Sequence, residues 1–192
     1  MCFSFEVSLV TGLVSWTIGL YLLLSNKARY DDKYYNVIFL MIFSSIQFAD
    51  AILWYNKLEK NNINYYTTSF LIPFILSLQL LYTFYIIQNN KNFVKAIFIW
   101  LYVMYLFYRF NGYSSKSDNC KKKLCSPVWG GKELHIIELF IFCALLLDTY
   151  YIGTLYGFSM IILVYNIFNY SYGSMWCAIS NIAAFYYLYN RY

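Results

Sequence analysis

Apolar residues in this chain occur in long runs, and polar residues collect in the short breaks between them. The first four runs cover residues 3–24, 35–56, 64–88 and 93–110. A helix of about 17 to 25 apolar residues has the length that is needed to cross about 30 Å of hydrocarbon. The pattern therefore predicts four membrane-spanning helices in this part of the chain, joined by short loops.

A polar stretch follows at residues 111–132, with glycine, serine, proline and six charged residues. This composition predicts a solvated, basic loop, the only one that is large enough to contact a protein partner outside the bilayer. Cys120 and Cys125 both lie in it. Either a disulfide, which implies an oxidising side of the membrane, or two free thiols fits their placement.

The last part of the chain, from Gly131 to Arg191, must hold the remaining helices in about 92 Å of helical length. Turn-forming residues at 148–153 and 169–173 favour three short helices there. The prediction is an all-α transmembrane helix bundle of seven spans in a single domain, 1–192. Six spans plus a re-entrant piece is the alternative.

Composition supports a membrane location, because 61% of the residues are hydrophobic and only 12% are charged, whereas a soluble domain has roughly 25% charged residues. The net charge of +5 is spread over loops, where basic residues set orientation, and no basic aromatic platform indicates nucleic acid.

The start of the chain lacks the basic region and cleavage site of a signal peptide, so we expect a retained first helix. Three basic residues in the loop after this helix favour an external N-terminus, although the lysines of 111–132 favour the reverse.

Small residues are spaced three or four apart in several runs, which places them on one helix face. Such stripes let helices approach closely in lipid, and we expect internal packing rather than a homodimer face. The stripe of the first run consists of Ser4, Ser8, Gly12, Ser15 and Gly19. The later stripes consist of Gly153 and Gly157, and of Gly173, Cys177, Ser180 and Ala184.

Three polar or aromatic residues of the second run, Gln47, Asp50 and Trp54, share one helix face. An aspartate near the middle of a spanning helix costs about 2.5 to 3.5 kcal/mol, so this face should point into the bundle. Lys95 and Arg109 lie at the two ends of the fourth run, so we expect neutral partners for the carboxyl, and burial then disfavours its charged form. The expected amide partners are Gln79, Asn166 and Asn181.

Two interpretations of this polar cluster are open. The first is functional: the cluster is a relay for protons or cations, or a pocket for a small polar ligand. The second is structural: the cluster is a set of hydrogen bonds that fixes the helices. Pro73 is expected to kink the third helix near Gln79. His135, three residues before Glu138, is expected to be a hydrogen-bonded residue at the interface rather than a catalytic base.

The sequence also argues against several classes of chemistry. A single histidine cannot build the metal sites of membrane hydrolases or desaturases. No GxSxG, P-loop or GxGxxG motif occurs, and the last run has no lysine for a retinal Schiff base. We therefore expect a protein that is not an enzyme and that holds no metal or cofactor.

Four short stretches together resemble an uncharacterised family of small multi-pass membrane proteins of large DNA viruses and some protists. They are MCFSFEVSL, IQFADAILW, the loop cysteines followed by KELHIIE, and GSMWCAISN. The second helix of that family usually carries a glutamate where this chain has Asp50. The resemblance implies several spans in a viral or host-cell membrane, and it implies no activity.

The functional expectation is a small carrier or channel for protons, cations or a polar metabolite, with the lipid bilayer as its first partner. The alternative is a structural or interaction protein of a viral or host membrane that uses the 111–132 loop as its contact surface. A water-accessible cavity at Asp50 would favour the first.

Overall fold

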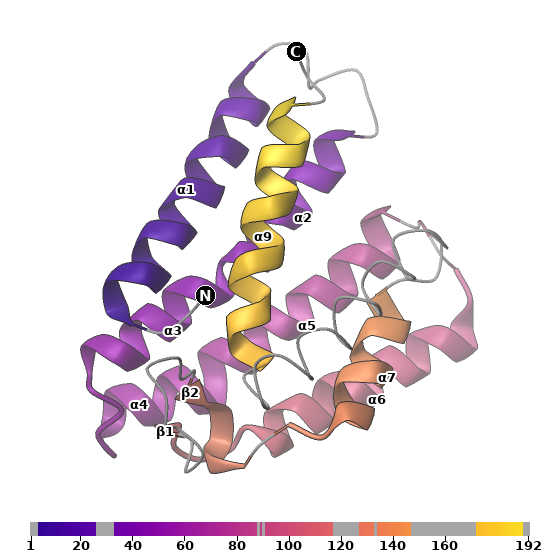
Figure 1. The fold of residues 1–192 in the computed structure, drawn as a ribbon. Helices are drawn as coiled ribbons and strands as arrows, with labels where there is room; N and C mark the ends of the chain where they lie inside the picture. Colours follow the sequence, from indigo (N-terminus) through magenta and orange to yellow (C-terminus); the bar gives the residue numbers. More distant parts are fainter. Residues whose placement is uncertain are drawn as a thin grey trace.

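The computed structural model describes residues 4–25, 33–87, 89, 91–116, 127–132, 134–146 and 172–189. They form a helical bundle that carries a short two-stranded ladder at one end (Figure 1). The helices are α1 (Phe5–Leu24), α2 (Lys33–Ser44), α3 (Ile46–Tyr55), α4 (Asn62–Tyr66), η2 (Thr67–Leu71), α5 (Ile72–Tyr82), η3 (Thr83–Ile87), α6 (Phe93–Arg109), α7 (Ile136–Leu146) and α9 (Tyr172–Tyr189). The ladder consists of β1 (Ser115–Lys116) and β2 (Pro127–Val128), and the short 3-10 turn η4 (Trp129–Gly131) follows it.

Among the described residues, three helical stretches are long and apolar enough to cross a membrane. They are Phe5–Leu24, Tyr34–Tyr55 and Asn62–Ile87, with 20, 22 and 26 residues. The predicted helices of spanning length are thus confirmed for the first three apolar runs. The fourth run forms α6, which has 17 residues. The count of seven spans stays a prediction, because residues 147–171 lie outside the described part of the chain.

The third long helix contains a π turn directly before Pro73, and the kink that the sequence predicts there stays a prediction. Pro73 itself lies in the first turn of α5, where the N–H that proline lacks has no partner within that helix. The turn before it, η2, is a π-helix in which the N–H of Ile72 donates to the carbonyl of Thr67. A second π turn, η3, ends the same helix. Wider turns of this kind occur frequently at functional sites.

The small-residue stripe of α1 is an internal packing face. Ser8, Gly12, Ser15 and Gly19 are buried, and α1 packs against α2, α3 and α9 (Figure 1). A Cβ atom added at Gly12 would lie 3.0 Å from the Phe48 ring. This face of α1 therefore lies inside the bundle. Gly153 and Gly157 lie outside the described residues, and Gly173 is described only as part of the α9 backbone.

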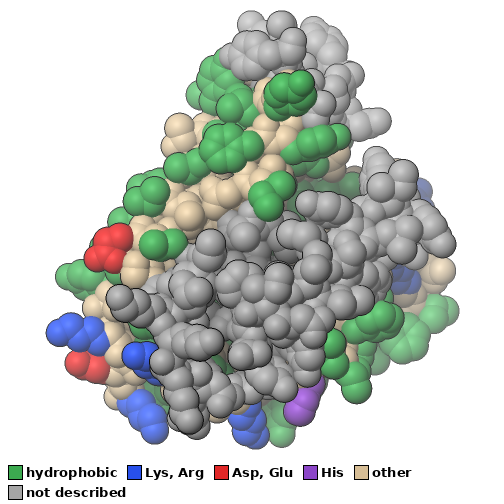
Figure 2. Space-filling view, viewed as in Figure 1, with side chains coloured by type: hydrophobic (Ala, Val, Ile, Leu, Met, Phe, Trp, Pro, Cys, Tyr) green, Lys and Arg blue, Asp and Glu red, His purple; other side chains and the backbone are tan. Residues whose placement is uncertain are grey.

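Residues 111–116 and 127–132, which we call the strap, fold back over one end of the bundle (Figure 1). The two halves pair antiparallel, with Ser115 opposite Val128. The expectation that all of 111–132 is solvated is wrong for these two ends. Ser114 is fully buried and Trp129 is only 5% exposed, because polar groups of the bundle bind both residues. Figure 2 shows several basic side chains at this end of the molecule and hydrophobic ones around α1.

Candidate functional site

Asp50 lies on α3, and its carboxyl is fully buried. Its Oδ1 accepts a hydrogen bond of 2.8 Å from Nε1 of Trp129, which comes from the strap, 79 residues away. Its Oδ2 is buried and has no hydrogen-bond partner among the described residues. Asp50 is five residues from Tyr55, the end of the span, or about 7.5 Å along the axis. The sequence analysis had placed this carboxyl near the middle of the helix. It lies instead toward the end of the helix that the strap covers.

Trp129 is positioned by the glycines that follow it. Gly130 and Gly131 have φ angles of +70° and +68°, a backbone conformation that residues other than glycine rarely adopt. A Cβ atom at Gly130 would lie 3.1 Å from the carbonyl oxygen of Arg109, so only glycine lets the strap pass this close to α6. The Trp129 ring packs edge-on against Phe110, with centroids 6.0 Å apart. The sequence WGG was the available signal for this turn.

Gln47 and Asn181 belong to a different polar cluster. Nε2 of Gln47 donates to the Ser180 hydroxyl, and the Ser15 hydroxyl donates to Oδ1 of Asn181 at 3.4 Å. These bonds join α1, α3 and α9. The single cluster that the sequence predicted is therefore divided, because side chains on one face of α3 meet partners from different elements. Trp54 is half-buried on α3, and Asn166 lies outside the described residues.

Gln79 on α5 is fully buried, but it does not bind Asp50. Neither of its amide atoms has a hydrogen-bond partner among the described residues. The same holds for the hydroxyl groups of Ser77, Tyr82 and Thr83. A buried polar group without a partner costs about 1 to 3 kcal/mol. We call Ser77, Gln79, Tyr82 and Thr83 the third-span polar residues.

A saturated hydrogen-bond network, which the sequence analysis missed, fixes the first half of the strap. Nδ2 of Asn64 donates to the carbonyl oxygens of Glu59 and Ser114 at 3.0 and 2.9 Å. Oδ1 of Asn64 accepts from the Ser114 N–H at 2.8 Å and from the Thr68 hydroxyl at 3.0 Å. Asn64, Thr68 and Ser114 are all fully buried. Asn64 and Thr68 are one helical turn apart, which was the available signal in the sequence.

An ion pair fixes the second half of the strap. Nε of Arg109, at the end of α6, lies 2.8 Å from Oε1 of Glu138 on α7, and the two side chains are 10% and 12% exposed. The Tyr105 hydroxyl also donates to Oε1, and the His135 N–H donates to Oε2 at 2.7 Å. Nη2 of Arg109 donates to the Lys132 carbonyl oxygen at 3.0 Å. This contact is made by the backbone of His135, so the hydrogen-bonded role expected of its imidazole stays a prediction.

The pKa of Glu138, which lies in the first turn of α7, is lower than that of an ordinary glutamate. Burial alone would raise this pKa, but hydrogen bonds from Tyr105, the His135 N–H and Arg109, together with the charge of Arg109, outweigh burial and lower it. The carboxyl is therefore ionised at neutral pH, and the ion pair is formed.

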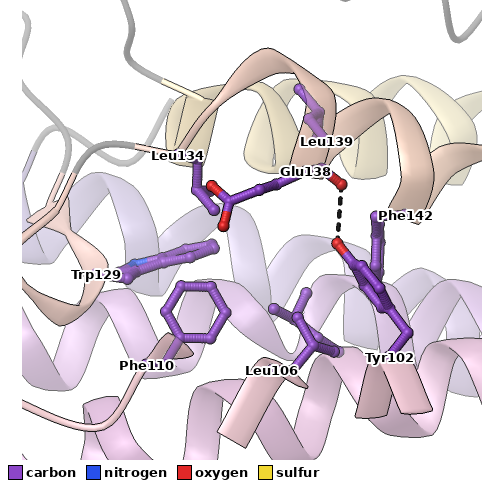
Figure 3. A pocket seen from close by; sticks show the side chains of 9 residues that line it. Tyr102, Leu106, Phe110, Trp129, Leu134, Glu138, Leu139 and Phe142 are labelled. Atoms are coloured by element: carbon purple, nitrogen blue, oxygen red, sulfur yellow. Dashed lines mark hydrogen bonds between the residues drawn. The ribbon is translucent and has the colours of Figure 1, made fainter. Parts of the chain in front are cut away.

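A small cavity of about 30 Å³ lies between α5, α6, α7 and the strap (Figure 3). It has room for about one water molecule. Trp129, Phe110 and Leu106 line it together with Glu138 and Phe142. Asp50 does not line this cavity. Trp129 lines the cavity and also binds the carboxyl of Asp50, so its ring separates the cavity from that carboxyl.

Among the described residues, no three His, Cys, Asp or Glu side chains lie close enough to hold a metal ion. Cys120 and Cys125 lie outside the described part. No family model matches the chain, and neither a curated protein nor a solved structure matches it. The described residues define a mostly helical protein with three apolar helices of membrane-spanning length.

Proposed function

We propose that this chain is a multi-pass membrane protein, not an enzyme, that carries protons or small cations and uses Asp50 as the exchanging group. The observation that carries the proposal is the environment of Asp50. Its carboxyl is fully buried in a helix of spanning length, and the donor that binds it is a neutral indole N–H. Ionisable groups inside membrane spans are costly and usually mark proton or ion pathways.

Among the described residues, no basic side chain binds Asp50, and this matters for exchange. A carboxylate that is fixed by an arginine is held in its charged form, whereas an indole N–H can bind either the neutral or the charged carboxyl. The nearby Arg109 is engaged with Glu138 and Lys132. Asp50 is therefore free to bind and release a proton or to exchange it for a small cation.

In this proposal the third-span polar residues are further binding positions for the proton or cation. Their hydrogen-bonding atoms are buried and have no partners among the described residues. In a purely structural core, such atoms would lower the stability of the fold. Transient water or a permeating ion would satisfy these atoms. The π turn η2 precedes these residues, and η3 begins at Thr83, the last of them. Such turns occur frequently at functional sites.

In this proposal α6 is the fourth of seven spans. Four crossings place the strap on the same side as the N-terminus, which is the outer side in the orientation that we favour. Asp50 is near that side, so the strap covers its approach from outside. The resemblance to membrane proteins of large DNA viruses and protists supports a viral or host-cell membrane as the location.

Flux measurements in proteoliposomes across a pH gradient test the proposal. Asp50→Asn keeps an oxygen that accepts from Trp129 and removes the ionisable group, so we expect at least a tenfold loss of flux from a folded protein. Glu59→Gln is the matched control, because Glu59 is an exposed carboxylate in the turn between α3 and α4. Unchanged flux in Asp50→Asn contradicts the proposal.

The second candidate is a structural or interaction protein. It is favoured by the closed core, since Asp50 is fully buried and the cavity of Figure 3 does not reach it. In that role the Asp50–Trp129 bond only holds the strap on the bundle, which presents its exposed face to a protein partner. A parent protein without flux under any gradient, whose stability falls in Trp129→Phe, supports this candidate.

A further inference from the structure

We propose that η4 is a gate over Asp50 and that the Arg109–Glu138 ion pair is the latch that keeps this gate closed. The name gate rests on the proposed function, whereas the latch is a physical link that is measured without any flux. The inference follows from how differently the two halves of the strap are attached.

The first half of the strap is fixed by groups that have no charge. Ser114 binds Asn64 and Thr68 through three short bonds at fully buried atoms. The Gly112 N–H also donates to the Ser69 hydroxyl at 3.0 Å. This half is therefore the anchored side, and a movement of the strap would occur in residues 127–132.

The second half pairs with β1 and binds Asp50, and beyond Trp129 it is attached through one ion pair. Arg109 binds the carbonyl oxygen of Lys132, directly after η4, while its Nε binds Glu138. Glu138 in turn binds the N–H of His135, at the start of α7. The pair thus fixes the chain on the C-terminal side of Trp129 at two backbone positions. Loss of Arg109 removes the bond to Lys132 directly, and loss of Glu138 removes both the bond to the His135 N–H and the carboxylate that orients the guanidinium toward Lys132.

Other groups around Glu138 do not replace Arg109. On α6 the hydroxyl of Tyr105 donates to the carboxylate, and the hydroxyl of Tyr102 donates to the backbone oxygen of Glu138 at 2.8 Å (Figure 3). Both tyrosines are neutral and join α6 to α7, without a bond to the strap. Among the described contacts, only Arg109 connects the pair directly to the residues next to η4.

The surroundings of Trp129 allow it to leave Asp50. The cavity lies against its ring, and Glu138 stands on another wall of the same cavity (Figure 3). Gly130 and Gly131 follow directly and give the backbone freedom to change its direction. When the latch is released, the backbone of η4 can turn at these glycines and carry the indole away from Asp50, and the carboxyl loses its donor.

The test follows the indole N–H of Trp129 by NMR in ¹⁵N-tryptophan-labelled protein in lipid nanodiscs. Its signal is the one that disappears in Trp129→Phe. We expect Glu138→Gln and Arg109→Gln each to increase the exchange of this N–H with water by about tenfold or more, as for loss of a hydrogen bond to a charged group. Tyr102→Phe is the matched control, with a change below about twofold, because it removes a neutral bond in the same α6–α7 contact.

Unchanged exchange in a folded Glu138→Gln or Arg109→Gln protein overturns the latch. If neither variant folds, Arg109→Lys keeps the positive charge but lacks the planar fork with which Arg109 reaches Lys132 and Glu138 together, so slow exchange in this variant also overturns the latch. The charge-swapped double variant Arg109→Glu with Glu138→Arg should bring the exchange rate back toward the parent value. Fast exchange in the single variants of a protein that shows no flux contradicts the proposed function and supports the latch.

Discussion

Two of the sites that attach the strap to the bundle are fully buried, at Asn64 and at Asp50, and they differ in how completely their polar atoms are satisfied. At Asn64 the side-chain oxygen and nitrogen each make two hydrogen bonds, all with neutral groups. At Asp50 one oxygen has one donor, and the other has none among the described residues. A saturated neutral network rigidifies a structure. An ionisable group with an unmet oxygen is instead the arrangement expected where a proton or ion must come and go.

The largest expected effect is the loss of the saturated site. Asn64→Ala leaves the carbonyl of Ser114 without its buried donor and removes the shorter of the two bonds of the Ser114 N–H, so we expect a loss of about 3 kcal/mol in the free energy of unfolding. Denaturation in mixed micelles, followed by circular dichroism, measures this quantity. Asn62→Ala is the control, since Asn62 is exposed two residues earlier on the same helix. Equal losses in the two variants would contradict the structural role of Asn64.

A smaller loss is expected at the other site. Trp129→Phe removes the donor of Asp50 but keeps an aromatic ring against Phe110, so the free energy of unfolding should fall by about 2 kcal/mol. The same denaturation experiment applies. Trp100→Phe is a suitable control, because Trp100 is half exposed on α6 and its indole N–H binds the Tyr85 hydroxyl at 3.3 Å. A loss at Trp129 larger than that at Asn64 would reverse the comparison between the two sites.

Acid separates the charged attachment of the strap from the neutral one. The pKa of Glu138 is lowered in the folded protein, so the ion pair with Arg109 stabilises the fold fully above pH 4.5, the ordinary value. That stabilisation is lost as the pH falls through the lowered pKa, and its size is about 1 kcal/mol for a partly exposed pair. Unfolding of the parent and of Glu138→Gln at pH 7 and pH 3 isolates it. Their difference should shrink at pH 3, whereas the loss in Asn64→Ala should be the same at both values.

The long helices were predictable because apolar run length alone decides whether a segment can cross hydrocarbon. The inward face of Gln47 and Asp50 was also predictable, since helical spacing places both on one side and lipid disfavours both. The partner of Asp50 was not. Trp129 lies in a stretch whose glycines, serine and lysines predict solvent exposure on average. Its burial depends on the docking of that stretch onto Asn64 and Arg109, which is a tertiary property with no local pattern.

The smallest expected change, that of Asp50→Asn, tells which form of the carboxyl the bundle holds. An amide has nearly the shape of a carboxylic acid, and its oxygen can still accept from Trp129. If Asp50 is neutral in the bundle, the substitution should alter the free energy of unfolding by less than about 1 kcal/mol, because one neutral hydrogen-bonding group replaces another. If it is ionised, the substitution removes a buried charge with a single donor, and the protein should become more stable by several kcal/mol. Denaturation at pH 7 distinguishes the two outcomes. A small change in the free energy of unfolding, combined with a loss of flux, would mean that the unmet oxygen of Asp50 serves function. The saturated bonds of Asn64 would then serve stability.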